Sequence, residues 1–348
     1  MKLFIQKLVE TPGPSGYESR VRDLVKREIE PLVDELYVDR LGNLIARKGT
    51  PGADGAKVML AAHLDEVGVA ATHIDEQGFV RFLPVGALSP LTCLGSRVQF
   101  LNGATGVIGV ERLADENKTP TFGQLFIDLG HSSRAECPVR IGDEAVFVQP
   151  FVDLGERLVG KALDDRIGVA LLVEVLRRMQ EQKFQTPHGL YFVFSVQEQV
   201  GARGAITAAY GVDPDLGIAI DATPSGDTPG GRKLVASLGK GPAIRVRDGS
   251  TLFDPYIVDW MVGTAEAAGL PFQLEVVEKE YTGGRAIQLS HAGVPVGCLS
   301  LPCRYMHSAS EMVDYRDFQN GVSLMLELLH KPFHPGSEQA DKPEWKPK

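Results

Sequence analysis

The chain has 348 residues, of which 43% are hydrophobic and 23% charged, the balance of a soluble globular protein with one large or two ordinary domains. Its formal net charge of -9 argues against a nucleic-acid partner, because such a surface needs clustered positive charge. No stretch approaches the ~18 uninterrupted apolar residues of a membrane span, and the N-terminal segment lacks the apolar core of a secretory signal, so we expect a cytoplasmic protein without a membrane partner.

The first part of the chain predicts a helix, a hairpin and a buried strand. Residues 18–31 place apolar side chains at helical spacing, which predicts a helix. The next stretch, 33–49, alternates in polarity around Gly42, which predicts a hairpin with its turn at that glycine. The run KVMLAAH at 57–63 is continuously apolar and too short for a helix, so we expect a central strand buried on both faces.

The segment from about Val69 to Asp153 has a different character. Short β-rich runs alternate there with Gly and Pro turns, and helical periodicity is scarce. We therefore expect an inserted all-β module, a small barrel.

After this segment, helical and strand patterns alternate again, which predicts an α/β fold. A central mixed sheet flanked by helices would form from residues 1–68 and 159–348, and a small all-β barrel domain at 69–158 would interrupt it. The Pro-rich, charged tail from Lys331 should be frayed. The expected helices lie at 165–180, 201–211, 254–268 and 314–330, and the expected strands at 189–198, 216–224, 272–278 and 296–302.

Side chains that could bind metal follow the predicted buried strands. In open α/β sheets, groups at the carboxyl ends of strands converge even when they are far apart in sequence. The candidates are His63 with Asp65 two residues later, Glu198, Asp221 and His307 at strand ends, and Asp164 at the start of the helix predicted for 165–180.

Each candidate has an ordinary structural explanation when it is taken alone. A histidine at a strand end is commonly a hydrogen-bonded core residue, and an aspartate after a strand is commonly a turn or helix N-cap residue. Together, however, they place several polar groups against buried strands, where an unpaired charge is costly. A divalent cation bound between them would remove that cost.

Imidazole and carboxylate ligands fit zinc-like ions, and a catalytic site of this kind keeps one position open. A carboxylate shared between two ions holds them roughly 3.5–4 Å apart, and a water between them loses its proton near neutral pH. Asp65 could accept the second ring N–H of His63 and fix its tautomer. Glu198 would then be the general base toward that water.

The sequence lacks the motifs of several other catalytic and nucleotide-binding sites. The segment GHSSR at 130–134 lacks the closing glycine of a nucleophile elbow. The chain has no GxxxxGK(S/T) phosphate loop, no GxGxxG and no HExxH. None of its four cysteines forms a CxxC pair, so a thiolate zinc site is not expected.

The motifs resemble metallopeptidase family 42, the glutamyl-aminopeptidase and tetrahedral-aminopeptidase group. The resemblance implies a catalytic α/β domain, a barrel domain that contributes to assembly, and removal of N-terminal residues from peptide substrates. It also implies a homo-oligomer, often a shell of twelve subunits. The motifs run over nearly the whole chain in one order: TPGPSGYE, DRLGNLIARKG, AAHLDEVG, GKALDDRIG, VQEQVGARGA, AIDATPSGDTPG and PCRYMHSASEMV.

The resemblance also implies a role for each matching residue. Asp164 would bridge two divalent metal ions, zinc or cobalt. His63 and Asp221 would complete one site, and His307 would serve the other. Asp65 would orient His63, and Glu198 would be the general base.

Two positions depart from the family pattern. The family usually reads QEEVG, with the second Glu on the second metal, whereas this chain has Gln199 there. A neutral amide is a weaker ligand, so the second site should bind weakly, stay empty or take a different ion. In place of a GTDA-like motif the stretch 281–287 carries Arg285, which would either pair with a substrate carboxylate or be an ordinary surface residue.

Three functions follow from these patterns. The first is a metal-dependent aminopeptidase that uses a metal-activated water with Glu198 as general base. The second, motivated by Gln199, is a catalytically impaired homologue that acts as a binding or assembly subunit. The third is a glycoside hydrolase, which would use paired carboxylates and need no metal.

Overall fold

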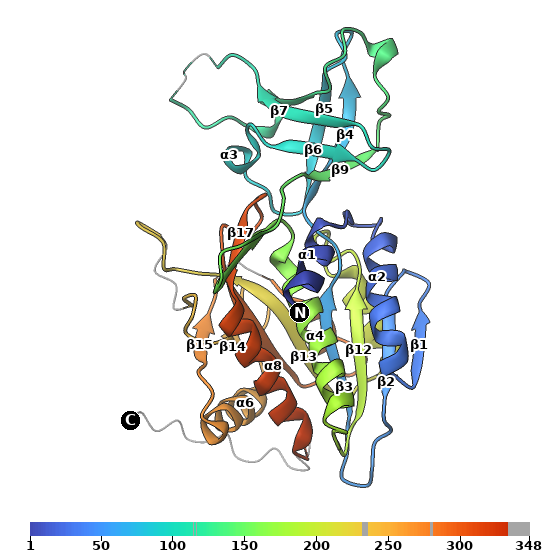
Figure 1. Cartoon of the computed structure of the whole chain (residues 1–348), viewed down its shortest axis with the longest axis vertical. Helices are drawn as coiled ribbons and strands as arrows, with labels where there is room; N and C mark the ends of the chain where they lie inside the picture. Colours follow the sequence, from blue (N-terminus) through green and yellow to red (C-terminus); the bar gives the residue numbers. More distant parts are fainter. Residues whose placement is uncertain (114, 116, 232–235, 279–280, 333–348) are drawn as a thin grey trace.

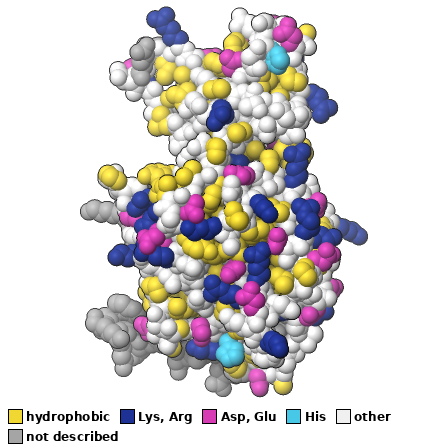
Figure 2. All heavy atoms as spheres, viewed as in Figure 1, with side chains coloured by type: hydrophobic (Ala, Val, Ile, Leu, Met, Phe, Trp, Pro, Cys, Tyr) yellow, Lys and Arg dark blue, Asp and Glu magenta, His cyan; other side chains and the backbone are white. Residues whose placement is uncertain are grey.

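A computed structural model describes residues 1–113, 115, 117–231, 236–278 and 281–332. Figure 1 shows a small β module that stands on a larger α/β body. On the visible face of the body, positively and negatively charged side chains are mixed (Figure 2). None of the described helices combines the length and apolarity needed to cross a bilayer. Most of the tail predicted to fray, from residue 333 onward, lies outside the described residues.

Within the described residues, eleven strands form the mixed sheet of the body, in the order β1-β2-β12-β3-β13-β16-β17-β11-β10, with β14 attached at β16 and β15 paired with β14. Strands β12, β3, β13 and β16 run parallel, so their carboxyl ends meet at one edge. The bounds are β1 Glu35–Val38, β2 Leu44–Lys48, β3 Lys57–His63, β10 Val152–Asp153, β11 Arg157–Gly160, β12 Gly189–Ser195, β13 Leu216–Pro224, β14 Ala243–Arg247, β15 Gln273–Val276, β16 Val296–Arg304 and β17 Glu311–Asp314.

Helices cover this sheet and explain why its central strands are continuously apolar. Helix α4 packs against β3, β13 and β16 and also contacts α1, α2 and α8. Helices α5 and α7 pack against each other; α5 also contacts β12 and β3, and α7 contacts β13 and β16. The bounds are α1 Lys2–Glu10, α2 Ser19–Ile29, α4 Leu163–Glu181, α5 Arg203–Val212, α6 Pro255–Ala268, α7 Gly284–Gln288 and α8 Tyr315–His330, with a short 3-10 turn, η1, at Glu30–Leu32.

The inserted module is a closed barrel, as predicted, with strand order β4-β5-β8-β7-β6-β9. It has a hydrophobic core of its own, which includes Phe82, Ile127 and Phe147. The domain boundaries at 69 and 158 stay a prediction; the barrel strands end at Phe147, and β10 and β11 pair within the large sheet. The bounds are β4 Gly68–Ile74, β5 Val80–Val85, α3 Pro90–Cys93, β6 Arg97–Phe100, β7 Thr105–Val110, η2 Phe122–Gln124, β8 Leu125–Asp128, η3 Arg134–Glu136 and β9 Glu144–Phe147.

The hairpin, the four central strands and the main helices agree with the sequence prediction. Gly42 has φ +113° in the turn between β1 and β2, a conformation that favours glycine. The sequence pattern did not predict α1, β14, α7 and β17. Three of these four elements span only four or five residues, too few for a periodic pattern to stand out.

A buried ion cluster ties the connection that leads from the body to the barrel to the start of α4. Glu66 lies between β3 and β4, and Lys161 lies between β11 and α4. The two Glu66 carboxylate oxygens lie 2.5 Å from Nζ of Lys161 and 3.1 Å from Nη2 of Arg166 in α4. Burial lowers the pKa of Lys161 to about 8, although Glu66 counteracts this effect. The outgoing connection to the barrel is therefore tied to the start of α4.

Candidate metal centre

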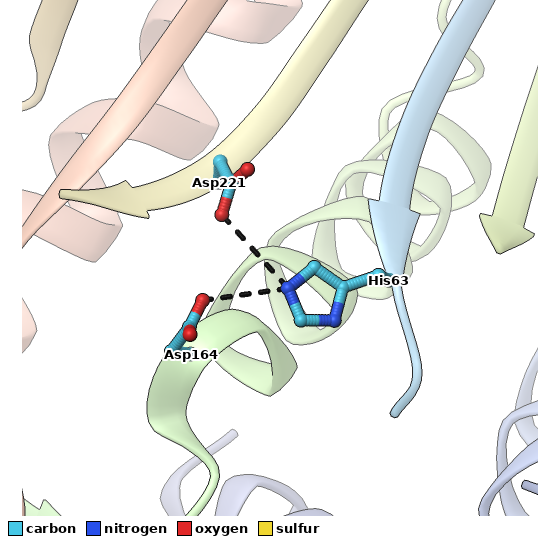
Figure 3. A group of neighbouring side chains, drawn as sticks. All are labelled: His63, Asp164 and Asp221. Carbon is cyan, nitrogen blue, oxygen red and sulfur yellow. Dashed lines mark ion pairs between the residues drawn. The ribbon is translucent and has the colours of Figure 1, made fainter. Parts of the chain in front are cut away.

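His63, Asp164 and Asp221 converge from three elements, β3, α4 and β13 (Figure 3). Nε2 of His63 lies 3.4 Å from Oδ1 of Asp164 and 4.0 Å from Oδ1 of Asp221. One potential ligand atom from each residue lies within 4.8 Å of the other two, and all three residues are buried. This separation is what three ligands around a single cation require.

The sheet register places two of these residues side by side. β3 and β13 are parallel neighbours, with Ala61 opposite Ala219, so Asp221 stands level with His63. Asp164 reaches the same point from the first turn of α4, where its backbone is extended (φ -82°, ψ 106°) rather than helical. The peptide bond that follows Asp164 is cis.

The charges of this cluster suit a cation. Burial raises the pKa of Asp221 well above its usual value. Burial alone would also raise the pKa of Asp164, but the neighbouring His307 and His63 outweigh it and hold that pKa far below its usual value. Oδ1 of Asp164 is buried and has no hydrogen-bond partner among the described residues. An ionised carboxylate with an unpaired buried oxygen fits a metal ligand.

His63 is oriented by the residue two positions later. Its Nδ1 lies 3.0 Å from the backbone carbonyl oxygen of Asp65 and 3.5 Å from the carboxylate. A carbonyl oxygen can only accept, so Nδ1 carries the proton. Nε2, which faces the two aspartates, would present its lone pair to a metal ion when the ring is neutral, as metal binding requires.

The Asp65 carboxylate instead holds the loop that carries Glu198. The backbone N–H groups of Glu198 and Gln199 donate to its two oxygens at 2.9 and 3.0 Å, and the hydroxyl of Ser15 donates at 2.6 Å. The N–H of Gln197 donates to Glu18 at 3.0 Å. These bonds fix the loop after β12. Burial raises the pKa of Glu198 to about 7, which suits a group that must accept and release a proton.

His307 meets the cluster from its other side. Its Nε2 lies 3.0 Å from Oδ2 of Asp164, and the Gln199 side-chain amide donates to the same oxygen at 3.2 Å. Behind them, buried Glu311 accepts one hydrogen bond from the N–H of Asp164 and one from the N–H of His307, both at 2.8 Å. Burial raises the pKa of Glu311 to about 8. This positioning residue was not predicted from the sequence; it is the first residue of β17, a strand of only four residues.

Left-handed backbone conformations surround the cluster. Ala162, Gln197, Ala202 and His307 have φ values between +53° and +61°. Such conformations in residues other than glycine cost roughly 1–3 kcal/mol each and concentrate at functional sites. All four lie on or within two residues of segments that line the cavity described next.

A cavity of about 680 Å³ opens onto the cluster. Its size suits a short peptide. His63, Asp164, Glu198, Asp221 and His307 line one part of it. The rest of the wall comes mainly from α5 and from α7 with the residues after it, and includes Ile206, Tyr210, Arg285, Leu289 and His291.

The structure thus brings all six predicted residues into one region, five in the cavity wall and Asp65 directly behind it. Their chemical roles stay predictions.

Comparisons with known proteins identify similar sequences and similar folds. The family model described as M42 glutamyl aminopeptidase matches residues 42–324. The lysyl aminopeptidase of Pyrococcus furiosus is 35% identical, covering 94% of this chain and 96% of its own.

Two solved structures share the whole fold. The aminopeptidase APDkam598 of the archaeon Desulfurococcus kamchatkensis has a TM-score of 0.89 and 37% identity, covering 94% of each chain. The TET1 peptidase of Pyrococcus horikoshii has a TM-score of 0.84 and 31% identity, covering 95% of this chain and 99% of its own. It can assemble into a tetrahedron or a large octahedral shell.

Proposed function

The chain belongs to the M42 glutamyl aminopeptidase family, and we propose that it is a metal-dependent aminopeptidase that removes N-terminal residues from short peptides. The observation that carries this proposal is the convergence of His63, Asp164 and Asp221 in the cavity that Glu198 also lines. The family and the relatives named above make hydrolysis of peptides the activity to test first.

His63, Asp164 and Asp221 would hold one divalent ion, zinc or cobalt, and Asp164 and His307 would contribute to a second. A bound ion of this kind supplies Lewis acidity and lowers the pKa of water. Glu198 takes the proton from the attacking water and passes it to the leaving amine. Asp65 keeps Glu198 in place through the backbone of the loop. The buried acidic end of the cavity also suits the positively charged α-amino group of a peptide.

Aminoacyl p-nitroanilides test this function directly. We expect hydrolysis with added zinc, cobalt or manganese, loss of activity in a chelator, and recovery when metal is restored. The matched control is the N-acetylated substrate, which lacks the free amino group and should resist cleavage. Absence of turnover with every ion at several pH values would contradict the proposal. Activity on glycosides that survives the chelator would favour the glycosidase alternative.

Gln199 weakens the binding of the second metal ion. Its amide donates to Oδ2 of Asp164, so it contributes an N–H where a ligand oxygen would be needed. A β-carbon on Gly86 would lie 2.8 Å from the Gln199 Oε1. The amide oxygen is therefore packed against the end of β5, on the side away from the cluster.

The variant Gln199→Glu is expected to raise the tightly held zinc from about one to about two ions per subunit, because a carboxylate replaces a neutral amide as ligand. Metal analysis after dialysis, together with zinc titration calorimetry, measures this change without relying on activity. Gln180→Glu, an exposed substitution on α4, is the control and should leave the zinc content unchanged. Two tightly held ions in the unaltered protein would refute this role of Gln199.

The same metal analysis tests whether the chain is a catalytically impaired homologue. If the unaltered chain holds fewer than one ion and is inactive, whereas Gln199→Glu is active, then the chain acts as a binding or assembly subunit. We favour the active enzyme, because Glu198 and the three residues of the first site are all present.

We further propose a homo-oligomer that works in the cytoplasm. The tetrahedral and octahedral assemblies of the Pyrococcus horikoshii relative support a closed shell, and a dodecamer is the form to look for by light scattering. The four described cysteines are free thiols, which suits a reducing compartment.

A further inference from the structure

Arg285 gives the cavity a positive charge away from the acidic cluster. Among the described residues, it is the sole arginine or lysine in the cavity wall. Its side chain is exposed, and no hydrogen bond or ion pair links it to another described residue. A cation in a cavity wall that has no partner among the described residues is available to an anionic ligand.

Much of the wall around Arg285 is apolar. Helix α5 contributes Ile206 and Tyr210, which lie on one helix face because they are spaced by four residues, and Ala202 precedes the helix. Ile206 is 51% exposed, and Tyr210 and Leu289 are each 67% exposed. A carboxylate that binds against this wall loses part of its hydration, and the Arg285 guanidinium can compensate for that loss.

The backbone that carries Arg285 is fixed by close packing. A β-carbon on Gly283 would lie 3.5 Å from Cβ of Ala205 and 3.7 Å from Oε2 of Glu198, and one on Gly284 would lie 2.8 Å from the ring of Phe253. Helix α7 thus begins directly against the proposed general base. Arg285, its second residue, is held at a constant place relative to Glu198.

We propose that Arg285 binds a carboxylate of the peptide substrate, so that the enzyme selects short peptides with this group beyond the acidic cluster. The inference rests on the proposed function and deepens it. The charges are complementary, because a peptide's α-ammonium suits the acidic end and its carboxylate suits Arg285. The carboxylate comes either from an acidic N-terminal side chain or from the free C-terminus.

Two substrate pairs separate these sources. The aminocoumarin amides of Glu and Gln differ only in the side-chain carboxylate, and Leu-Gly-Gly and its C-terminal amide differ only in the terminal one. We expect the unaltered enzyme to prefer the carboxylate member of one pair by about fivefold or more in kcat/KM, the effect of a charge-assisted hydrogen bond.

Arg285→Gln should remove this preference, lowering kcat/KM more for the carboxylate member than for the uncharged member of the pair, because the charge-assisted bond is lost. Arg285→Lys should keep part of it, because the charge remains without the planar fork. The matched control is Arg203→Gln, an exposed arginine at the start of α5 outside the cavity wall. A preference unchanged in Arg285→Gln for both pairs would overturn the proposal.

A binding measurement tests this inference independently of the proposed hydrolytic function. Calorimetry with the same four compounds on the cobalt-loaded Glu198→Gln protein, with and without Arg285→Gln, needs no turnover. If the unaltered protein hydrolyses nothing but this binding preference depends on Arg285, the aminopeptidase proposal fails and the carboxylate site stands. If peptides are hydrolysed and neither pair shows a dependence on Arg285, the carboxylate site fails alone.

Discussion

Replacing Glu198 by glutamine is expected to lower kcat for peptide hydrolysis by about a hundredfold to ten-thousandfold, the range for loss of a general base. Glutamine keeps the shape of the side chain, and its backbone N–H can still donate to Asp65. It cannot accept the proton of the attacking water. KM should change little, because Glu198 is placed to act on the water rather than to hold the peptide.

The metal content separates this effect from a damaged site. His63, Asp164 and Asp221 form the ligand group without Glu198, so Glu198→Gln should hold as much zinc as the unaltered protein. Glu181→Gln, an exposed substitution at the end of α4, is the control and should keep full activity. If Glu198→Gln retains more than about a tenth of kcat, Glu198 is not the general base.

The second large effect is expected on stability. Glu66→Ala should lower the free energy of unfolding by about 3–5 kcal/mol, because it leaves the charges of Lys161 and Arg166 buried without their partner. Lys161 and Arg166 are 4% and 0% exposed. Water therefore cannot replace the lost carboxylate.

Urea unfolding of the metal-free protein measures this change without the stabilisation that bound metal adds. The control is Glu35→Ala, which removes the 3.0 Å contact with Arg47 at an exposed position. Its effect should stay within about 1 kcal/mol, as for other surface ion pairs. Equal effects of the two substitutions would mean that the buried cluster contributes no more than a surface pair.

The sequence predicted the parts of this fold that depend on local pattern. The run 57–63 and the run 216–224 read as buried strands because they are continuously apolar, and both are covered by helices in the structure. Polar residues at such positions stand out, which is why His63 and Asp221 could be singled out. The change of pattern after Val69 likewise marked the barrel.

A local sequence pattern does not show which distant segments of the chain meet in the fold. Glu311 lies in a four-residue strand, and its function depends on reaching the N–H groups of Asp164 and His307. Asp65 was expected to orient His63 through its carboxylate, whereas its carbonyl oxygen lies nearer, and the carboxylate holds the loop of Glu198. Both depend on three-dimensional closeness, which spacing in the sequence does not encode.

The order of strands in the large sheet also determines how late in its synthesis the protein can assemble its metal-binding residues. β3 lies between β12 and β13, which begin at Gly189 and Leu216, more than 120 residues after His63. A ribosome that has just released β3 has made neither neighbour, and His307 is translated later still. The nascent chain is therefore unable to bring its histidines together, and any peptide-cutting power arises only after most of the polypeptide has been synthesised.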